Sequence, residues 1–348
     1  MRRTLDGRSG GILFPDLEKA GKYVYTAYTC GGTAVPLGEP LEAALSIEED
    51  APADAFSGVF PFPWKEAFEA FEAFEEFGRE KRTVPVFLEI CREGRGEVFF
   101  GPIDELRHRV SSEGCALELA ARSRAALLLD NEAVPQTYLY PSLPLLFKRH
   151  GEPYGFSEWE GETGGFSEPF TVTKGMSEWE VLALFCSRYL KAPLRARGRK
   201  LQALRERGSG RPRLHFGGDI PLLECAVEEK FCERYSEILV RPENTEAYTL
   251  SVAGRKAQEL GLRRRRLLNG SEDQAREALR KAEKRAFCAE LLVPGLPVPG
   301  AGVGTFAALT LPDTGETLPD LYVSGLRYSL SSSGESCRYY LRRRGEED

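Results

Sequence analysis

Histidine, methionine and long apolar runs are scarce in this chain of 348 residues. It has three histidines and two methionines, and no apolar run approaches the ~20 residues that a membrane helix needs. Residues 1–30 also lack the apolar core of a secretory signal peptide. We therefore expect synthesis in the cytoplasm without export by a signal peptide, and no membrane partner.

The sequence signatures of common enzymes are missing as well. There is no G-x-x-x-x-G-K-[ST] phosphate loop, no G-x-S-x-G nucleophile elbow and no H-E-x-x-H zinc motif. The spacing of His215, Cys225 and Cys232 matches no structural zinc pattern, and a fourth ligand is not evident. The sequence predicts a protein that is not an enzyme, with no catalytic residue, metal site or cofactor.

Cysteines and charges narrow the class further. The eight cysteines form no C-x-x-C pair and are scattered through predicted strands and helices, which is typical of reduced, buried thiols. The 47 basic and 53 acidic residues give a net charge of −6, which argues against a dedicated nucleic-acid binder. With 42% hydrophobic residues, the chain can bury a sizeable core, and its length favours two or three domains.

Residues 97–142 are the most informative stretch. Gly101-Pro102 interrupts an apolar run at a point where these residue types break or bulge a strand. Residues 111–114 have turn chemistry, and the alternation that follows from Cys115 predicts a half-buried antiparallel strand. The pattern indicates a hairpin, then a basic exit, then a short apolar turn ended by Asp130.

Helices are predicted in the middle of the chain and strands toward both ends. Ser177 with Glu180 forms a capping box, and Ser271 caps a helix that we expect to reach about Ala289. This layout predicts an α+β fold with two antiparallel β-barrel domains and an inserted mixed helical domain. We assign residues 1–122 to the first β-barrel domain, 123–222 plus 255–293 to the inserted domain, and 223–254 plus 294–348 to the second β-barrel domain.

At these residues the chain resembles the baseplate hub family of contractile phage tails, which includes the Mu-type tail protein P and is related to the first half of VgrG. The resemblance rests on residues 101–105, on residues 121–130, into which the next strand runs, and on the stretches 170–182 and 321–330. Ala121 departs from the usual glycine of the family. The signature positions are Gly101, Asp104, Arg122, Arg124, Asp130, Gly175 and Trp179.

The resemblance implies a homotrimeric ring in which each chain contributes two similar β-barrels, adapting a sixfold tail tube to a threefold cell-puncturing spike. The implied partners are other copies of the chain, the tail tube protein, the trimeric spike protein, other baseplate proteins and the tape measure protein, with no specific nucleic acid. The implied location is the baseplate of a virion or tailocin, assembled in the bacterial cytoplasm. Two alternatives stay open: a LysM-like peptidoglycan-binding or muralytic tail component, from the start at Phe170, and a VgrG-like effector-delivery spike.

Two segments of opposite charge suggest how such a ring is held. Residues 39–80 contain twelve acidic and two basic residues, and within them Phe68, Phe71, Phe74 and Phe77 predict a helix packed on a barrel. Residues 195–213 contain eight basic residues and one acid. A solvated loop or a phosphate-binding run would also have this composition. We predict an interface at Arg195, Arg197, Arg199 and Lys200, facing acidic residues of a neighbouring subunit or of the tube protein, with assembly weakened by salt.

Overall fold

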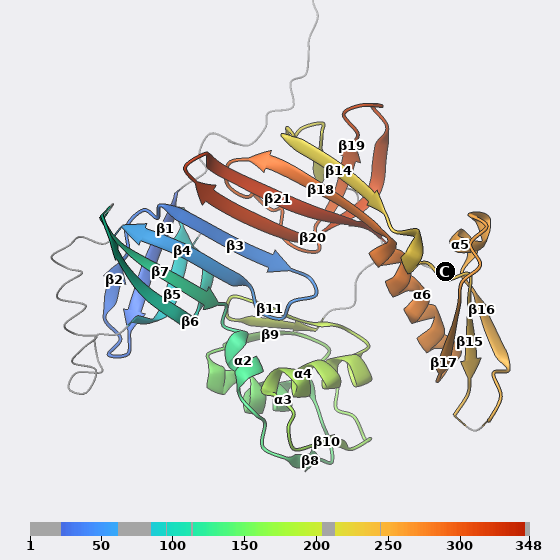
Figure 1. The fold of residues 1–348 in the computed structure, drawn as a ribbon. Helices are drawn as coiled ribbons and strands as arrows, with labels where there is room; N and C mark the ends of the chain where they lie inside the picture. Colours follow the sequence, from blue (N-terminus) through green and yellow to red (C-terminus); the bar gives the residue numbers. More distant parts are fainter. Residues whose placement is uncertain are drawn as a thin grey trace, which may run out of the picture.

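The computed structural model describes residues 22–61, 85–94, 96–112, 114–203, 213–243 and 245–344. Within these ranges the chain is mostly β-strand with a few short helices, so the predicted α+β class is confirmed (Figure 1). The predicted aromatic helix at Phe68 to Phe77, and the basic residues Arg205, Arg207 and Arg211, lie outside the described residues. None of the helices in the described ranges is both long and apolar enough to cross a membrane.

A 13-stranded sheet forms the body of the molecule. Its main path runs β14-β18-β21-β20-β3-β4-β7-β6-β5-β1-β2. Off this path, β19 pairs with β20 and with β13. The strands of the first half are β1 (Tyr23–Thr29), β2 (Ala34–Pro36), β3 (Glu42–Glu48), β4 (Ala55–Pro61), β5 (Pro85–Arg92), β6 (Gly96–Ser111) and β7 (Gly114–Arg122). Those of the second half are β13 (Leu214–Phe216), β14 (Glu224–Glu229), β18 (Phe287–Pro294), β19 (Phe306–Thr310), β20 (Thr317–Ser331) and β21 (Gly334–Arg343).

The two halves are joined at a seam between β3 and β20. One edge of β3 pairs with β4 and the other with β20, so Ala44 lies opposite both Ser57 and Ser329. Because both edges of β3 are occupied, the halves are continuous. This corrects the prediction of two β-barrels: among the described strands, pairing forms one open sheet and closes neither half.

Each half of the sheet nevertheless curls around its own core. Buried side chains of β1 and β3–β7 form the first core, and those of β13 and β18–β21 form the second. Tyr328 of β20 is buried in the first core, and Ile47 of β3 packs against both. The seam therefore ties the two cores together as well as the two backbones.

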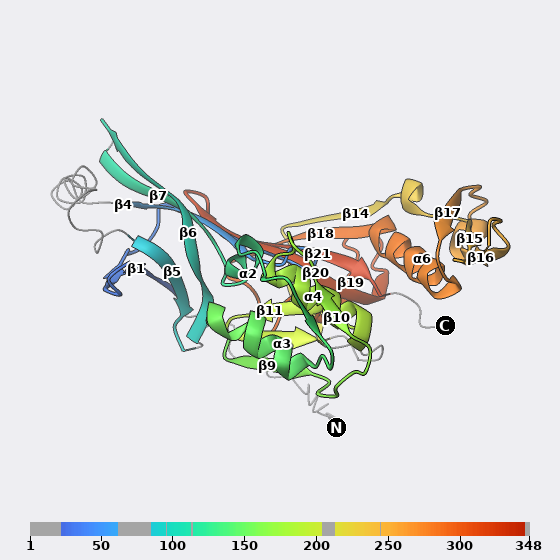
Figure 2. The ribbon, with the colours of Figure 1, turned by 90° about the horizontal axis from the view of Figure 1, so that it is seen from below.

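The strand β6 bends sharply and serves both layers of the first half. Its residues 96–102 pair with β5 and its residues 103–111 pair with β7, with a register shift between Ile103 and Glu105. The bulge expected near Gly101-Pro102 is therefore confirmed, although it lies inside one long strand rather than between two. Beyond the bend the β6–β7 hairpin projects from one end of the molecule (Figure 2).

An inserted unit follows β7. It contains α2 (Ala126–Asp130), β8 (Gln136–Tyr138), α3 (Leu143–His150), β9 (Glu158–Gly161), β10 (Phe170–Val172), α4 (Glu178–Phe185), β11 (Leu194–Arg197) and β12 (Lys200–Ala203) around a third core. Ser177 and Glu180 form the predicted capping box at α4. Pro144 lies in the first turn of α3. Proline is tolerated in a first helical turn, where its missing N–H has no partner to lose.

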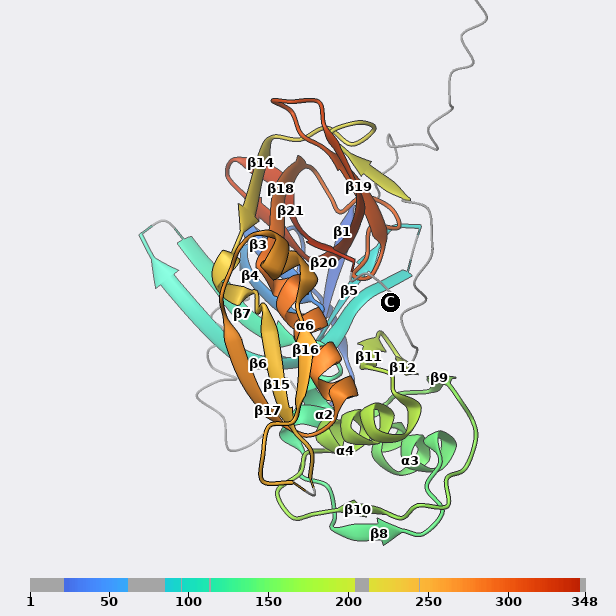
Figure 3. The ribbon, with the colours of Figure 1, turned by 90° about the vertical axis from the view of Figure 1, so that its right-hand side faces the viewer.

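A second small unit projects from the opposite end of the sheet (Figure 2). Its strands β15 (Glu237–Arg241), β16 (Leu250–Ala253) and β17 (Arg265–Asn269) pair only with one another among the described strands. The short helix α5 (Arg255–Glu259) follows β16, and α6 (Glu272–Ala286) packs along this three-stranded sheet (Figure 3). This grouping differs from the predicted one, which placed 223–254 with the second barrel and 255–293 with the inserted domain. The helix capped by Ser271 ends at Ala286, because β18 begins at Phe287.

Candidate functional site

The bend of β6 brings three signature residues together. Arg122, at the end of β7, donates to Asp104 of β6 through Nε and Nη2 at 2.7 and 2.9 Å. It also donates to Asp130, at the end of α2, through Nη1 and Nη2 at 3.1 and 2.7 Å. The hydrogen bonds that Arg122 donates to Asp104 and, to a lesser extent, to Asp130 raise the pKa of Arg122. These two-point ion pairs fix the direction in which the inserted unit leaves the sheet.

Gly101 makes a close backbone contact beside this cluster. A Cβ atom at Gly101 would lie 1.8 Å from the carbonyl oxygen of Arg122. The Arg124 amide donates to the Phe100 carbonyl at 2.7 Å across the same junction. Only glycine lets the two chain segments meet at this distance, which gives the signature glycine a steric reason.

Arg124 packs in the interior of the same junction. Its guanidinium carbon lies 4.4 Å from the centre of the Phe100 ring, and the residue is 7% exposed. Burial lowers the pKa of Arg124, with Glu97 acting in the opposite direction. On its other side the Arg124 guanidinium lies against the backbone of Gly155, where an added Cβ would be 2.6 Å from Arg124 Nη1. Arg124 thus fills the contact between the sheet and the inserted unit.

The last two signature residues lie in the inserted unit, apart from this cluster. Gly175 has a φ of +90°, and its amide donates to Glu132 Oε1 at 2.7 Å. Trp179 of α4 belongs to the buried core of the unit. Both residues shape the entry of the chain into α4.

The predicted interface residues find acidic partners within the chain. Arg195 pairs with Glu49 at 3.0 Å, Arg199 with Glu97 at 3.9 Å, and Lys200 with Glu160 at 2.7 Å, while Arg197 donates to the Val303 carbonyl. The contact with a neighbouring subunit stays a prediction. The side chain of Arg199 is 60% exposed, more than the side chains of Arg195 and Lys200.

Arg195 and Arg197 hold a three-way junction, which we define as Glu49, Asp54, Arg195, Arg197 and Val303. Glu49 accepts from Arg195 of the inserted unit and, at 2.8 Å, from the hydroxyl of Tyr322 in β20. Burial raises the pKa of Asp54 to about 6, although Arg197 acts to lower it. The junction connects both sheet halves to the inserted unit.

Reversing both arginines of this junction should loosen the inserted unit. We expect Arg195→Glu with Arg197→Glu to destabilise the protein by about 2 kcal/mol or more, because each reversal places a second carboxylate beside a partly buried one. Lys200→Glu is the matched control, since its more exposed pair is worth less than about 1 kcal/mol. Hydrogen exchange of residues 123–203 measures the effect. Equal protection in the two proteins would contradict a docking role for the junction.

The inserted unit contains a buried polar network that the sequence analysis did not predict. His150 at the end of α3 bonds through Nδ1 to Glu178 and through Nε2 to the Tyr138 hydroxyl, at 2.8 Å for the latter. The Tyr154 hydroxyl donates to the other oxygen of Glu178 at 3.1 Å. Both His150 and Glu178 are buried, so the network stabilises the inserted unit and has no direct access to a substrate. One sequence signal could have indicated that His150 is buried: it shares the helical spacing of the buried residues Leu143, Leu146 and Phe147.

The LysM-like start at Phe170 does not continue into a separate module. Its strand β10 pairs with β8, which precedes it in the chain. The strands after α4, β11 and β12, join β9 in a different sheet. No group of three or more potential metal ligands gathers in the described part of the chain, and His215 instead bonds to the Thr310 hydroxyl at 2.7 Å.

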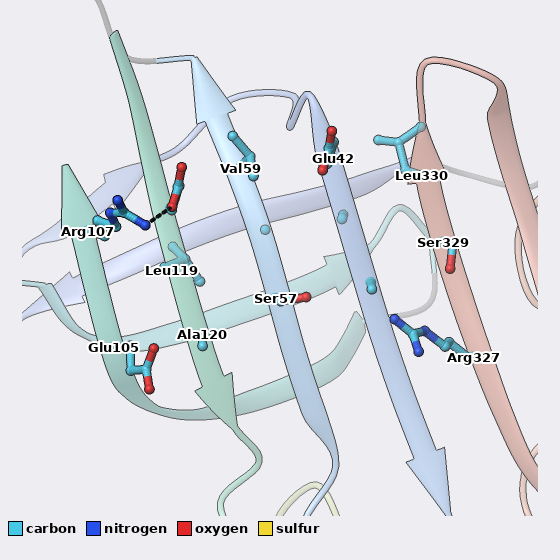
Figure 4. A pocket seen from close by; sticks show the side chains of 14 residues that line it. Glu42, Ser57, Val59, Glu105, Arg107, Leu119, Ala120, Arg327, Ser329 and Leu330 are labelled. Atoms are coloured by element: carbon cyan, nitrogen blue, oxygen red, sulfur yellow. Dashed lines mark ion pairs between the residues drawn. The ribbon is translucent and has the colours of Figure 1, made fainter. Parts of the chain in front are cut away.

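The outer face of the large sheet carries a hollow of about 480 Å³ beside the seam (Figure 4). Strands β20, β3, β4, β7 and β6 line it. Its charged side chains are Glu42, Glu105, Arg107, Glu118 and Arg327, and Arg107 pairs with Glu118 at 3.6 Å. The hollow is thus built from both halves of the sheet.

No protein-family model and no curated protein matches this sequence. The fold, in contrast, matches solved tail proteins over most of the chain. The tail protein from Neisseria meningitidis MC58 is 16% identical with a TM-score of 0.70, covering 92% of this chain and 96% of that one. The prophage MuSo2 43 kDa tail protein from Shewanella oneidensis is 14% identical with a TM-score of 0.69, covering 92% and 97%.

A more distant match comes from a secretion system. The E. coli c3393 protein, a type VI secretion component with structural similarity to the T4 bacteriophage tail proteins gp27 and gp5, is 10% identical with a TM-score of 0.51. The match covers 88% of this chain and 74% of that one. At these identities the comparisons establish a shared fold, that of phage tail proteins.

Proposed function

We propose that this protein is a structural component of a contractile tail baseplate, namely the hub that joins the tail tube to the spike. The observation that carries the proposal is the match to whole tail proteins, which covers nearly all of both chains. A shared domain would match only part of each chain. The names of these similar proteins describe tail components, which supports a structural rather than an enzymatic role.

The two-half sheet supports the finer proposal of a trimeric adaptor. Each chain has two curled sheet halves with separate cores, so three copies present six halves around an axis. The same three copies present three inserted units. Such a ring would solve the mismatch between a sixfold tube and a threefold spike, because the same protein would present one surface six times and a second surface three times.

The partners that follow are other copies of the chain, the tube protein, the spike protein, further baseplate proteins and the tape measure protein. The proposed location is the baseplate of a virion or tailocin, after assembly in the bacterial cytoplasm. Both rest on the resemblance of the signature residues and on the shared fold.

The oligomeric state tests this proposal. Light scattering on the purified protein should give about 116 kDa, three times the 38.7 kDa chain, because a ring of this kind closes with three copies. The measurement should be repeated on assembled particles, where the map should contain three copies. A monomer throughout the micromolar range, together with particles that lack three copies, would remove the hub proposal.

A further inference from the structure

The hollow beside the seam has a floor of short side chains. One row crosses five strands: Ser329 lies opposite Ala44, Ala44 opposite Ser57, Ser57 opposite Ala120, and Ala120 opposite Glu105. Neighbouring strands lie about 4.8 Å apart, so this row is about 19 Å long. Because four of its five residues are alanine or serine, a partner can come close to the sheet backbone.

Longer side chains flank this floor on both sides. On one side Glu42 lies opposite Val59, Val59 opposite Glu118, and Glu118 opposite Arg107. On the other side Arg327 lies opposite Ser46. The two flanks are four residues apart along each strand, or about 14 Å. An α-helix with its side chains is about 10–12 Å across, so the hollow has the width of one helix and the length of about 13 helical residues.

Three charges of the hollow have no ion-pair partner among the described residues. They are Glu42, Glu105 and Arg327, whereas Glu118 pairs with both Arg107 and Arg109. Figure 4 shows the three at different corners, with Glu42 and Arg327 on opposite flanks and Glu105 at the far end of the floor. Two free acids against one free base favour an occupant with a net positive charge.

We infer that this hollow binds a short basic α-helix of a partner protein. The helix places alanine or other small apolar residues on the floor, lysine or arginine toward Glu42 and Glu105, and an acidic residue toward Arg327. Complementary charges then set the register and direction of the helix. This inference does not depend on the trimeric ring, because the hollow is complete within one chain.

Two designed peptides test it. The first is a stapled helix of about 14 residues with an alanine face, two flanking lysines and one glutamate at the matching corners. The second exchanges the lysines and the glutamate. In fluorescence anisotropy with the full chain, we expect the first to bind about tenfold more tightly, since each exchange converts an attractive exposed pair into a repulsive one.

Substitutions in the hollow complete the test. Ser57→Trp should abolish binding of the first peptide by filling the floor, whereas Val227→Trp, an exposed strand position outside the hollow, should not change it. Glu42→Lys with Glu105→Lys should reverse the preference between the peptides. Equal affinities, no binding of either peptide, or full binding to Ser57→Trp would overturn the inference. So would a lower molar mass of Ser57→Trp, which would identify a second copy of this chain as the occupant.

Discussion

Gly101→Ala is expected to lower the free energy of unfolding by about 3 kcal/mol, at the upper end for inserting a methyl group into packed structure. The added Cβ would lie 1.8 Å from the Arg122 carbonyl oxygen and 2.7 Å from the carbonyl carbon of Ser123. Both are backbone atoms, so a side-chain rotation cannot relieve the contact. The end of β7 must move away from β6, which weakens the Arg124–Phe100 backbone hydrogen bond and displaces Arg122 from its two aspartates.

The matched control for this substitution is Gly164→Ala. Gly164 has no positive φ, and a Cβ there would meet nothing within 4 Å. Alanine at such a site restricts the unfolded chain, so we expect no loss and a gain of up to about 1 kcal/mol. Thermal unfolding followed by tyrosine and tryptophan fluorescence compares the two variants. Similar melting temperatures would refute the steric account of the signature glycine.

The bend was largely accessible from the sequence, whereas the ion pairs of Arg122 were not predicted. Gly101-Pro102 predicted the irregularity of β6, and the alternation from Cys115 predicted its partner β7. Local rules suffice there, because the hairpin joins residues close in the chain. The same holds for the helix caps at Ser177 and Ser271, where the side chain and the amide it accepts from are three residues apart.

The seam between β3 and β20 was not accessible in the same way. Gly325 lies opposite Glu48, although 277 positions separate them in the chain. The residue pattern of neither strand predicts that the two strands pair. The alternation of buried and exposed residues in β3 would fit an edge strand of the first half equally well as a strand shared between the two halves. The hollow follows from this pairing, since Ser329 and Arg327 reach it only across the seam.

The charged run at Arg195 shows a related limit. Its composition indicated a need for acidic partners, but composition cannot tell a partner in the same chain from one in a neighbour. Glu49, directly after β3, and Glu97, in β6, lie 146 and 102 positions before their partners Arg195 and Arg199, and only the fold brings the partners together. Pairing within the chain avoids the entropy of association, so it competes well with a contact between subunits.

A buried arginine helps to attach the small unit of β15–β17 and α6 to the large sheet. Arg234 is 1% exposed, and its Nη2 lies 2.6 Å from Glu229 at the end of β14. Its Nε donates at 3.1 Å to Glu283 of α6. Glu229 also accepts from Arg343 of β21 at 3.1 Å. The guanidinium of Arg234 thus joins β14 of the large sheet to α6 of the small unit, and Glu229 extends the network to β21.

Arg234→Ala should therefore release this unit from the sheet. Removing one member of a buried ionic network typically costs about 3–5 kcal/mol; because both glutamates are about one third exposed, we expect the lower end, about 3 kcal/mol. Arg276→Ala, which breaks an exposed pair with Glu272 in the same helix, should cost less than about 0.5 kcal/mol. Hydrogen exchange is the suitable measurement, because a loss confined to residues 231–286 would not register as a single unfolding transition. Faster exchange across that unit in Arg234→Ala, with the core strands of the first half unchanged, is the expected result. If Arg276→Ala produced an equal change, the attachment would have to come from the apolar contacts of Phe287 and Ala286 rather than from Arg234.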